Sequence, residues 1–94
     1  MLFLVISQPL PTRPSQVADD RRRYWKWLQP LIDGGEVRQV YGRVGRGAVA
    51  VLDLESNQRL HALMNQWADT IPAEFQVFPL LDTGAMQQFL ATQP

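Results

Sequence analysis

Residues 49–67, VAVLDLESNQRLHALMNQW, decide the fold because they join a strand to a helix. The aliphatic and β-branched run that opens the stretch is typical of a strand. Ser56 then supplies a preferred helix N-cap. After it, apolar side chains recur at the spacing of one helix face: Leu60, Leu63, Met64 and Trp67. The stretch therefore predicts a strand over residues 47–54 and a helix that ends near Asp69.

The polar residues of the same stretch allow two interpretations. His61 is the only histidine of the chain, and its ordinary pKa of about 6.5 suits a general base. Asp53 and Glu55 share a strand parity and could form an acid/base pair. Alternatively, the carboxylates match the helix dipole, and His61 lies roughly 110° from the centre of the apolar stripe, toward solvent or a neighbouring subunit. We expect a capped junction in preference to a catalytic centre.

Outside this stretch, the apolar pattern predicts strands over residues 2–7, 37–44 and 75–81, a helix from about 15 to 33, and a short helix over 85–90. Pro30 should kink or loosen the end of the long helix, and Pro79 fits a strand only at an edge or a bulge. The order β-α-β-β-α-β predicts an α+β, ferredoxin-like fold in which a four-stranded antiparallel sheet carries both helices on one face. We expect a single domain over residues 1–94, with 82–94 as a C-terminal tail.

The pattern of the predicted strands also indicates what covers the other face of the sheet. The segments LFLVI and AVAVL are apolar at both strand parities, whereas a strand with one wet face alternates apolar and polar residues. Covering about 600 Å² per subunit at roughly 25 cal/mol per Å² yields on the order of 15 kcal/mol before association costs. We therefore expect a homodimer in which two sheets pack face to face.

The composition of the 94 residues excludes several classes of protein. The chain has no cysteine and one histidine, which leaves no disulfide framework and no HxxxH or HxH metal motif. Nine basic and nine acidic residues give no electrostatic footprint for nucleic acid or for anionic membrane lipid. The opening MLFLVIS lacks the charged region of a signal peptide and is better explained as a strand. We expect a cytoplasmic protein with no cofactor and no metal.

The segment RRRYWKW, residues 21–27, mixes basic and aromatic side chains, as some nucleic-acid-binding segments do. Helix geometry instead places Arg22, Arg23 and Lys26 on the outer face of the long helix. There we expect Asp19 and Asp33 to counter their charge. Arg21 is different because it falls within the apolar stripe. It must extend its guanidinium to water along that surface or find a carboxylate partner.

Tyr41 and Arg43 share a parity on the second predicted strand. If that side faces a cavity, a phenol and a guanidinium would point at an anionic ligand; otherwise the charge blocks further pairing at an edge strand. RNA-recognition domains use the same element order, but they stack bases on aromatic residues of the third strand. Here that strand, RGAVAVLD, has no aromatic residue, so RNA binding is excluded.

Residues 1–5, MLFLV, and 51–64, VLDLESNQRLHALM, resemble the muconolactone isomerase family of dimeric α+β barrels. That family has a comparable strand end, an aspartate, a serine that caps a helix, and a Leu-His pair at this spacing. The resemblance extends loosely through residues 75–80. It implies a barrel dimer that can assemble into a larger ring. Where the family carries a Trp-Arg pair in the second strand, this chain has Val40-Tyr41, which implies a different pocket.

Two functions follow from these observations. The first is a non-enzymatic homo-oligomer that binds a small organic acid or a protein partner, or serves as an assembly module. The second is a cofactor-free isomerase acting on a small anionic or lactone-like molecule, with candidate catalytic residues Tyr41, Arg43, Asp53 and His61. The scarcity of titratable residues in the predicted barrel favours the first. A filled aliphatic interior would contradict the second, and an open cavity with converging polar groups would support it.

Overall fold

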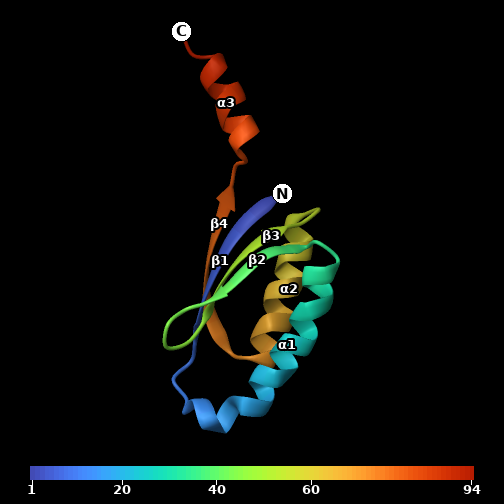
Figure 1. Ribbon diagram of the computed structural model, residues 1–94, viewed down its shortest axis with the longest axis vertical. Helices are drawn as coiled ribbons and strands as arrows, with labels where there is room; N and C mark the ends of the chain where they lie inside the picture. The colour runs from blue at the N-terminus through green and yellow to red at the C-terminus, as the bar shows by residue number, and fades with distance from the viewer.

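The computed structural model describes residues 1–94 as a four-stranded antiparallel sheet with two long helices on one side of it (Figure 1). The helices are η1 (Pro14–Val17), α1 (Ala18–Asp33), α2 (Asn57–Thr70) and α3 (Thr83–Ala91). The strands are β1 (Leu2–Pro9), β2 (Val37–Gly42), β3 (Ala48–Asp53) and β4 (Ala73–Leu80). The predicted βαββαβ order and α+β class are confirmed.

The sheet order is β2-β3-β1-β4, and every neighbouring pair is antiparallel. Val5 at the centre of β1 is paired with Ala50 on one side and Val77 on the other. The units β1-α1-β2 and β3-α2-β4 each cross over one intervening strand, and right-handed crossovers place both helices on the same face. Pro79 lies in the edge strand β4, as predicted.

The core lies between the sheet and the two helices. Phe3, Val5, Ala50, Leu52 and Leu54 contribute from the sheet side, and Tyr24, Leu28, Leu63 and Trp67 from α1 and α2. Trp67 is central, because its ring centroid lies 5.2 Å from those of both Tyr24 and Phe75. Burying side chains of this size contributes roughly 1.5–3 kcal/mol each, so this layer supplies most of the stability of the fold.

Two local differences from the predicted elements have physical causes. The first predicted turn of the long helix is the separate 3-10 helix η1, which begins at Pro14. At the other end, α1 continues through Pro30 to Asp33, and the Gly34 N–H donates to the Pro30 carbonyl oxygen at 2.9 Å. The expected early loosening at Pro30 is therefore replaced by a closed last turn.

The β2–β3 turn is held against β1 by a glycine that no other residue can replace without strain. Gly47 has a φ of +102°, and a Cβ placed on it would lie 2.4 Å from the Ser7 carbonyl oxygen. Gly45, in the same turn, also has a positive φ of +97°, but open space surrounds it. The close approach at Gly47 fixes where the turn sits relative to β1.

The second face of the sheet has no helix over it (Figure 1). By strand alternation it presents the apolar residues Leu4, Ile6, Val49, Val51, Phe78 and Leu80. At one edge, β2 has a register shift between Val37 and Gln39. The last helix, α3, extends beyond the end of β4 and contacts no other helix or strand, and the molecule measures 57 × 25 × 20 Å. None of the helices has both the length and the apolar character that a membrane span requires.

Candidate functional site

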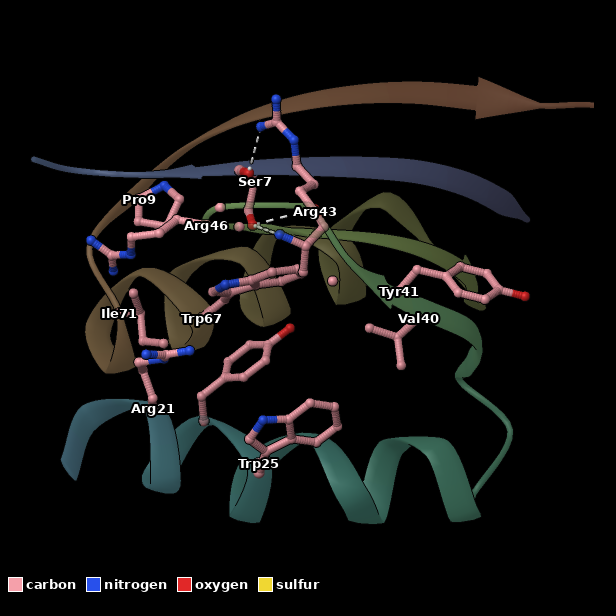
Figure 2. Close-up of a pocket in the computed structure, with 15 residues that line it drawn as sticks. Ser7, Pro9, Arg21, Trp25, Val40, Tyr41, Arg43, Arg46, Trp67 and Ile71 are labelled. Atoms are coloured by element: carbon pink, nitrogen blue, oxygen red, sulfur yellow. Dashed lines mark hydrogen bonds between the residues drawn. The ribbon is translucent and has the colours of Figure 1, made fainter. Parts of the chain in front are cut away.

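A cavity of about 200 Å³ lies between the β2–β3 turn and α1 (Figure 2). One wall comes from β2 and the β2–β3 turn, and Arg21, Tyr24 and Trp25 of α1 form the other. Trp67 of α2 closes the cavity. The residues of the first wall are Val40, Tyr41, Gly42, Arg43, Gly45, Arg46 and Gly47. An engineered cavity of about 150 Å³ in another protein holds benzene. The volume is therefore sufficient for a ligand with one six-membered ring. Beside the packed core, the space between the β2–β3 turn and α1 is therefore open.

Tyr24 supplies a buried hydroxyl that has no hydrogen-bond partner. The residue is 7% exposed, lines the cavity, and packs its ring against Trp25, Trp27 and Trp67 at centroid separations of 6.0, 5.8 and 5.2 Å. Burial raises the pKa of the Tyr24 phenol well above its ordinary value. At neutral pH it is therefore a hydrogen-bond donor, and leaving such a donor unsatisfied costs about 1–3 kcal/mol.

Three arginines line the cavity, and only one of them has no acceptor within the chain. Arg43 donates from Nη1 to the Ser7 carbonyl oxygen at 3.1 Å and to Gln8 Oε1 at 3.0 Å. Arg46 donates to the carbonyl and hydroxyl oxygens of Thr12 at 3.2 and 3.1 Å. These two side chains tie the turn to β1 and to the loop after it.

Arg21 makes no hydrogen bond and no ion pair with the protein. It lies on α1 one turn before Tyr24, and Figure 2 shows its side chain rising from the helix toward Ile71. Of the two expectations for this cation in an apolar stripe, the extension to water holds: Arg21 is exposed to solvent, and no carboxylate partner is found. No carboxylate lines the cavity at all. The cavity therefore combines an uncompensated guanidinium with an uncompensated hydroxyl.

Aromatic rings border this pair of donors. Trp67 is buried behind the cavity, while Trp25 and Tyr41 are largely exposed at its rim. Flat apolar faces with a few polar groups are the usual lining of small-molecule sites. The chemistry offered is stacking on an aromatic ring together with donation to an anion.

The structure brings together two of the four candidate residues named from the sequence. Tyr41 and Arg43 both line the cavity, although the Arg43 guanidinium is already bonded across β1. Asp53 lies at the opposite end of β3, where its Oδ2 is 2.6 Å from Arg38 Nη2 and its Oδ1 is 3.5 Å from the Met1 amino group. His61 is exposed on α2, and its carbonyl accepts from Asn65 at 2.8 Å.

The strand-to-helix junction is capped, as predicted. The Ser56 hydroxyl accepts from the Arg59 N–H at 3.1 Å. Arg59 in turn donates two hydrogen bonds of 2.8 Å to the Glu36 carboxylate, which lowers the pKa of Glu36. These groups satisfy one another, so folding alone accounts for them.

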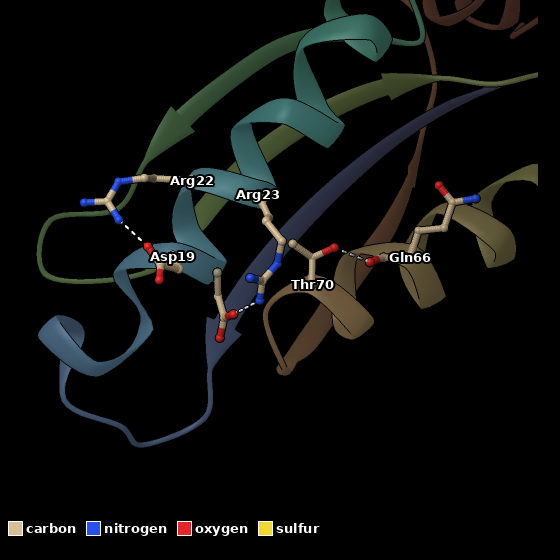
Figure 3. A network of polar contacts seen from close by, with 6 residues as sticks. Asp19, Arg22, Arg23, Gln66 and Thr70 are labelled. Atoms are coloured by element: carbon tan, nitrogen blue, oxygen red, sulfur yellow. Dashed lines mark hydrogen bonds and ion pairs between the residues drawn. The ribbon is translucent and has the colours of Figure 1, made fainter.

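The basic segment on α1 is a paired surface, as the outer-face interpretation predicts. Arg22 pairs with Asp19 and Arg23 with Asp20 along the helix (Figure 3). Asp33, which we expected to counter these charges, instead accepts from Gln29 at 2.9 Å. That expectation was wrong because Asp33 lies at the far end of α1, whereas Asp20 lies one turn from Arg23. No three histidine, cysteine, aspartate or glutamate residues come close enough together to hold a metal ion.

Comparison with known proteins gives a family and a fold. A family model described as a domain of unknown function, DUF3303, matches residues 1–93. No curated protein matches the chain. Among solved structures, it is similar to 5-chloro-2-hydroxyhydroquinone dehydrochlorinase (TftG) from Burkholderia phenoliruptrix AC1100, in complex with 2,5-dihydroxybenzoquinone. The TM-score is 0.72 at 17% identity, over 89% of this chain and 97% of that one, which shows a shared fold.

Proposed function

We propose that this chain, which belongs to the DUF3303 family of domains of unknown function, is a homodimeric protein that binds a small organic acid in the cavity beside Arg21 and Tyr24. The observation that carries the proposal is that both donors line one cavity and neither has an acceptor in the protein. A bound carboxylate supplies the acceptor. Charge-assisted hydrogen bonds of this kind contribute about 1.5–3 kcal/mol each.

The rest of the lining narrows the class of acid. The cavity volume suits one ring, and Trp25 and Trp67 offer aromatic faces. Arg43 and Arg46 keep the local potential positive even though their guanidiniums are engaged. A single-ring aromatic carboxylate, with benzoate as the simplest probe, meets all three conditions.

The homodimer rests on the uncovered face of the sheet. Leu4, Val51 and Phe78 lie on that face together with further aliphatic side chains, and contiguous apolar patches of this kind are uncommon on monomers. Two such faces packed together form the dimeric α+β barrel of the muconolactone isomerase-like architecture. The fold shared with the dehydrochlorinase is consistent with that assembly.

A cofactor-free enzyme is the second candidate, and one observation favours it. The solved structure with the same fold holds 2,5-dihydroxybenzoquinone, a one-ring molecule of the size that this cavity accepts. In that role Tyr41 and Arg43 would line the substrate and Tyr24 would donate a proton. We favour binding, because the raised pKa of the Tyr24 phenol makes it a poor proton donor and Asp53 and His61 lie outside the cavity.

Titration of the protein with benzoate, followed by tryptophan fluorescence and calorimetry, tests the ligand site. Arg21→Gln removes the uncompensated cation and should raise the Kd at least tenfold. Arg22→Gln is the matched control, because that neighbouring cation pairs with Asp19 outside the cavity, and its Kd should stay within twofold. Benzamide, an uncharged analogue, should bind at least tenfold more weakly. Equal affinity of both variants, or no binding of any single-ring acid, would contradict the proposal.

Sedimentation tests the dimer separately. Val51→Glu places a charge at the centre of the uncovered face and should shift the protein to monomer with its circular dichroism unchanged. Gln58→Glu, on the exposed start of α2, adds the same charge away from that face and should leave the dimer intact. A wild-type protein that sediments as a monomer at micromolar concentration would overturn the dimer and leave the ligand site standing.

A further inference from the structure

The C-terminal helix α3 has an apolar face that nothing in its own chain covers. Leu81, Met86, Phe89 and Leu90 are 61%, 56%, 65% and 70% exposed. The helix contacts no other element and extends past the end of the sheet (Figure 1). The radius of gyration is accordingly 15.4 Å, whereas a compact domain of this length has about 12 Å.

A helix of this length does not persist alone in water. Isolated helices shorter than about 12–15 residues are marginal, and α3 has nine. Asp82 caps it by accepting from the Ala85 N–H at 2.7 Å, but one cap contributes only about 1 kcal/mol. The helix therefore needs a surface to pack against.

The sheet of its own chain does not cover this helix. Only Leu81 and Asp82 separate β4 from α3, and Asp82 is extended with a ψ of 163°. Leu80, the last residue of β4, is paired with Leu2, the first residue of β1, and α3 beyond it contacts none of the strands. In this conformation, the surface that covers α3 comes from another molecule.

We infer that α3 is an exchanged arm, which packs its apolar face on a second copy of this chain. The arm is continuous with Phe78 and Leu80 of the uncovered sheet face, so a copy seated on that face lies beside it. No charged residue follows Asp82, which gives the arm no electrostatic attraction to nucleic acid or to anionic lipid.

The area involved fits a stable interface. The four side chains expose on the order of 400 Å² of apolar surface per chain. A twofold dimer buries two such arms, together with the surface they cover, and the sheet faces add to this. The arms and the surface they cover alone come to about 1,600 Å², which is the area that a standard stable interface buries.

Photocrosslinking identifies what the arm touches. The chain has no cysteine, so Leu90→Cys carries a benzophenone label at a single site on the apolar face of α3. Irradiation of a mixture with tagged wild-type protein should give covalent tagged dimers. Gln88→Cys, labelled on the opposite side of the same helix, should give at least fivefold less. Crosslinks confined to one chain, or none between chains, would overturn the exchanged arm.

Sedimentation of arm variants supplies an independent measurement. Phe89→Gln with Leu90→Gln should raise the dimer Kd at least tenfold, whereas Gln87→Ala with Gln88→Ala should leave it unchanged. Because α3 contacts no other element of its own chain, thermal unfolding of the monomer should not move. A dimer of unaltered Kd would overturn the inference while leaving the sheet-face dimer, which Val51→Glu tests, intact. Binding of the wild-type arm to neutral phospholipid vesicles in place of dimerisation would also overturn it.

Discussion

The two ends of the sheet differ in whether their polar side chains find hydrogen-bond or ion-pair partners. At the end where β3 finishes, Asp53 meets Arg38 and the amino terminus, and Glu36 meets Arg59. At the end where β3 begins, the buried Tyr24 hydroxyl has no hydrogen-bond partner, and the exposed Arg21 makes no ion pair with the protein. Native proteins satisfy nearly all buried polar groups, and exceptions concentrate at functional sites. The junction is therefore explained by folding alone, whereas the turn end holds the unsatisfied hydroxyl on which our proposal of a ligand rests.

The largest expected effect is a loss of stability caused by a substitution in the β2–β3 turn. Gly47→Ala forces an L side chain into a φ of +102° and places its Cβ against the Ser7 carbonyl oxygen. Backbone strain and displacement of β1 should lower the free energy of unfolding by about 3 kcal/mol, measured by urea denaturation. Gly45→Ala is the matched control, because its φ is also positive but its Cβ meets nothing, and it should cost about 1 kcal/mol. Equal losses would mean that the turn is not clamped to β1.

The second substitution should raise stability, and it tests whether the Tyr24 hydroxyl lacks a hydrogen-bond partner. Tyr24→Phe removes a buried hydroxyl that makes no hydrogen bond while keeping the ring contacts. The free energy of unfolding of the ligand-free protein should rise by about 1 kcal/mol, while the benzoate Kd rises several-fold. Thermal unfolding with and without benzoate measures both. A loss of stability would show that the hydroxyl is satisfied in the folded protein and that the two ends do not differ.

At the end of the sheet where the polar groups are paired, Glu36→Gln should lower the free energy of unfolding modestly, by an amount that depends on pH. The pKa of Glu36 is lowered in the folded protein, so its contribution is present above its unfolded pKa and is lost as the pH falls through the folded value. The pair is about one-third exposed, so we expect at most about 1 kcal/mol at pH 7. Urea denaturation from pH 7 down to pH 3 should show the wild-type advantage disappear. If the wild-type protein is still more stable than the variant at pH 3, packing of the Glu36 side chain, and not its charge, accounts for the difference.

The smallest effect concerns His61. His61→Ala should change the free energy of unfolding by no more than about 0.5 kcal/mol, because the side chain is exposed on α2. The benzoate Kd should also stay constant, because the residue does not line the cavity. A tenfold loss of ligand affinity, measured by calorimetry, would place the site at the junction end instead.

The fold could be predicted from the periodicity of apolar residues, but whether each polar group has a hydrogen-bond partner could not. Ser56 was predicted as a cap because capping depends on a residue type and its neighbours in sequence. Tyr24 lies on the buried face of α1, yet no pattern along the chain says whether its hydroxyl finds an acceptor. Arg21 carried the one available signal, a cation inside an apolar stripe. What the sequence cannot supply is the set of groups that β1, the β2–β3 turn and α2 bring to that stripe.

The free edges of the sheet limit how copies of this chain can add to one another. Pro79 in β4 offers no N–H to an incoming strand, and the shifted register at Arg38 bends β2 away from straight pairing. Growth by edge-to-edge strand addition, the route to fibrils, is thereby discouraged on both sides. The edges therefore suit the closed, face-to-face dimer that we propose, because neither edge favours open-ended addition of further copies.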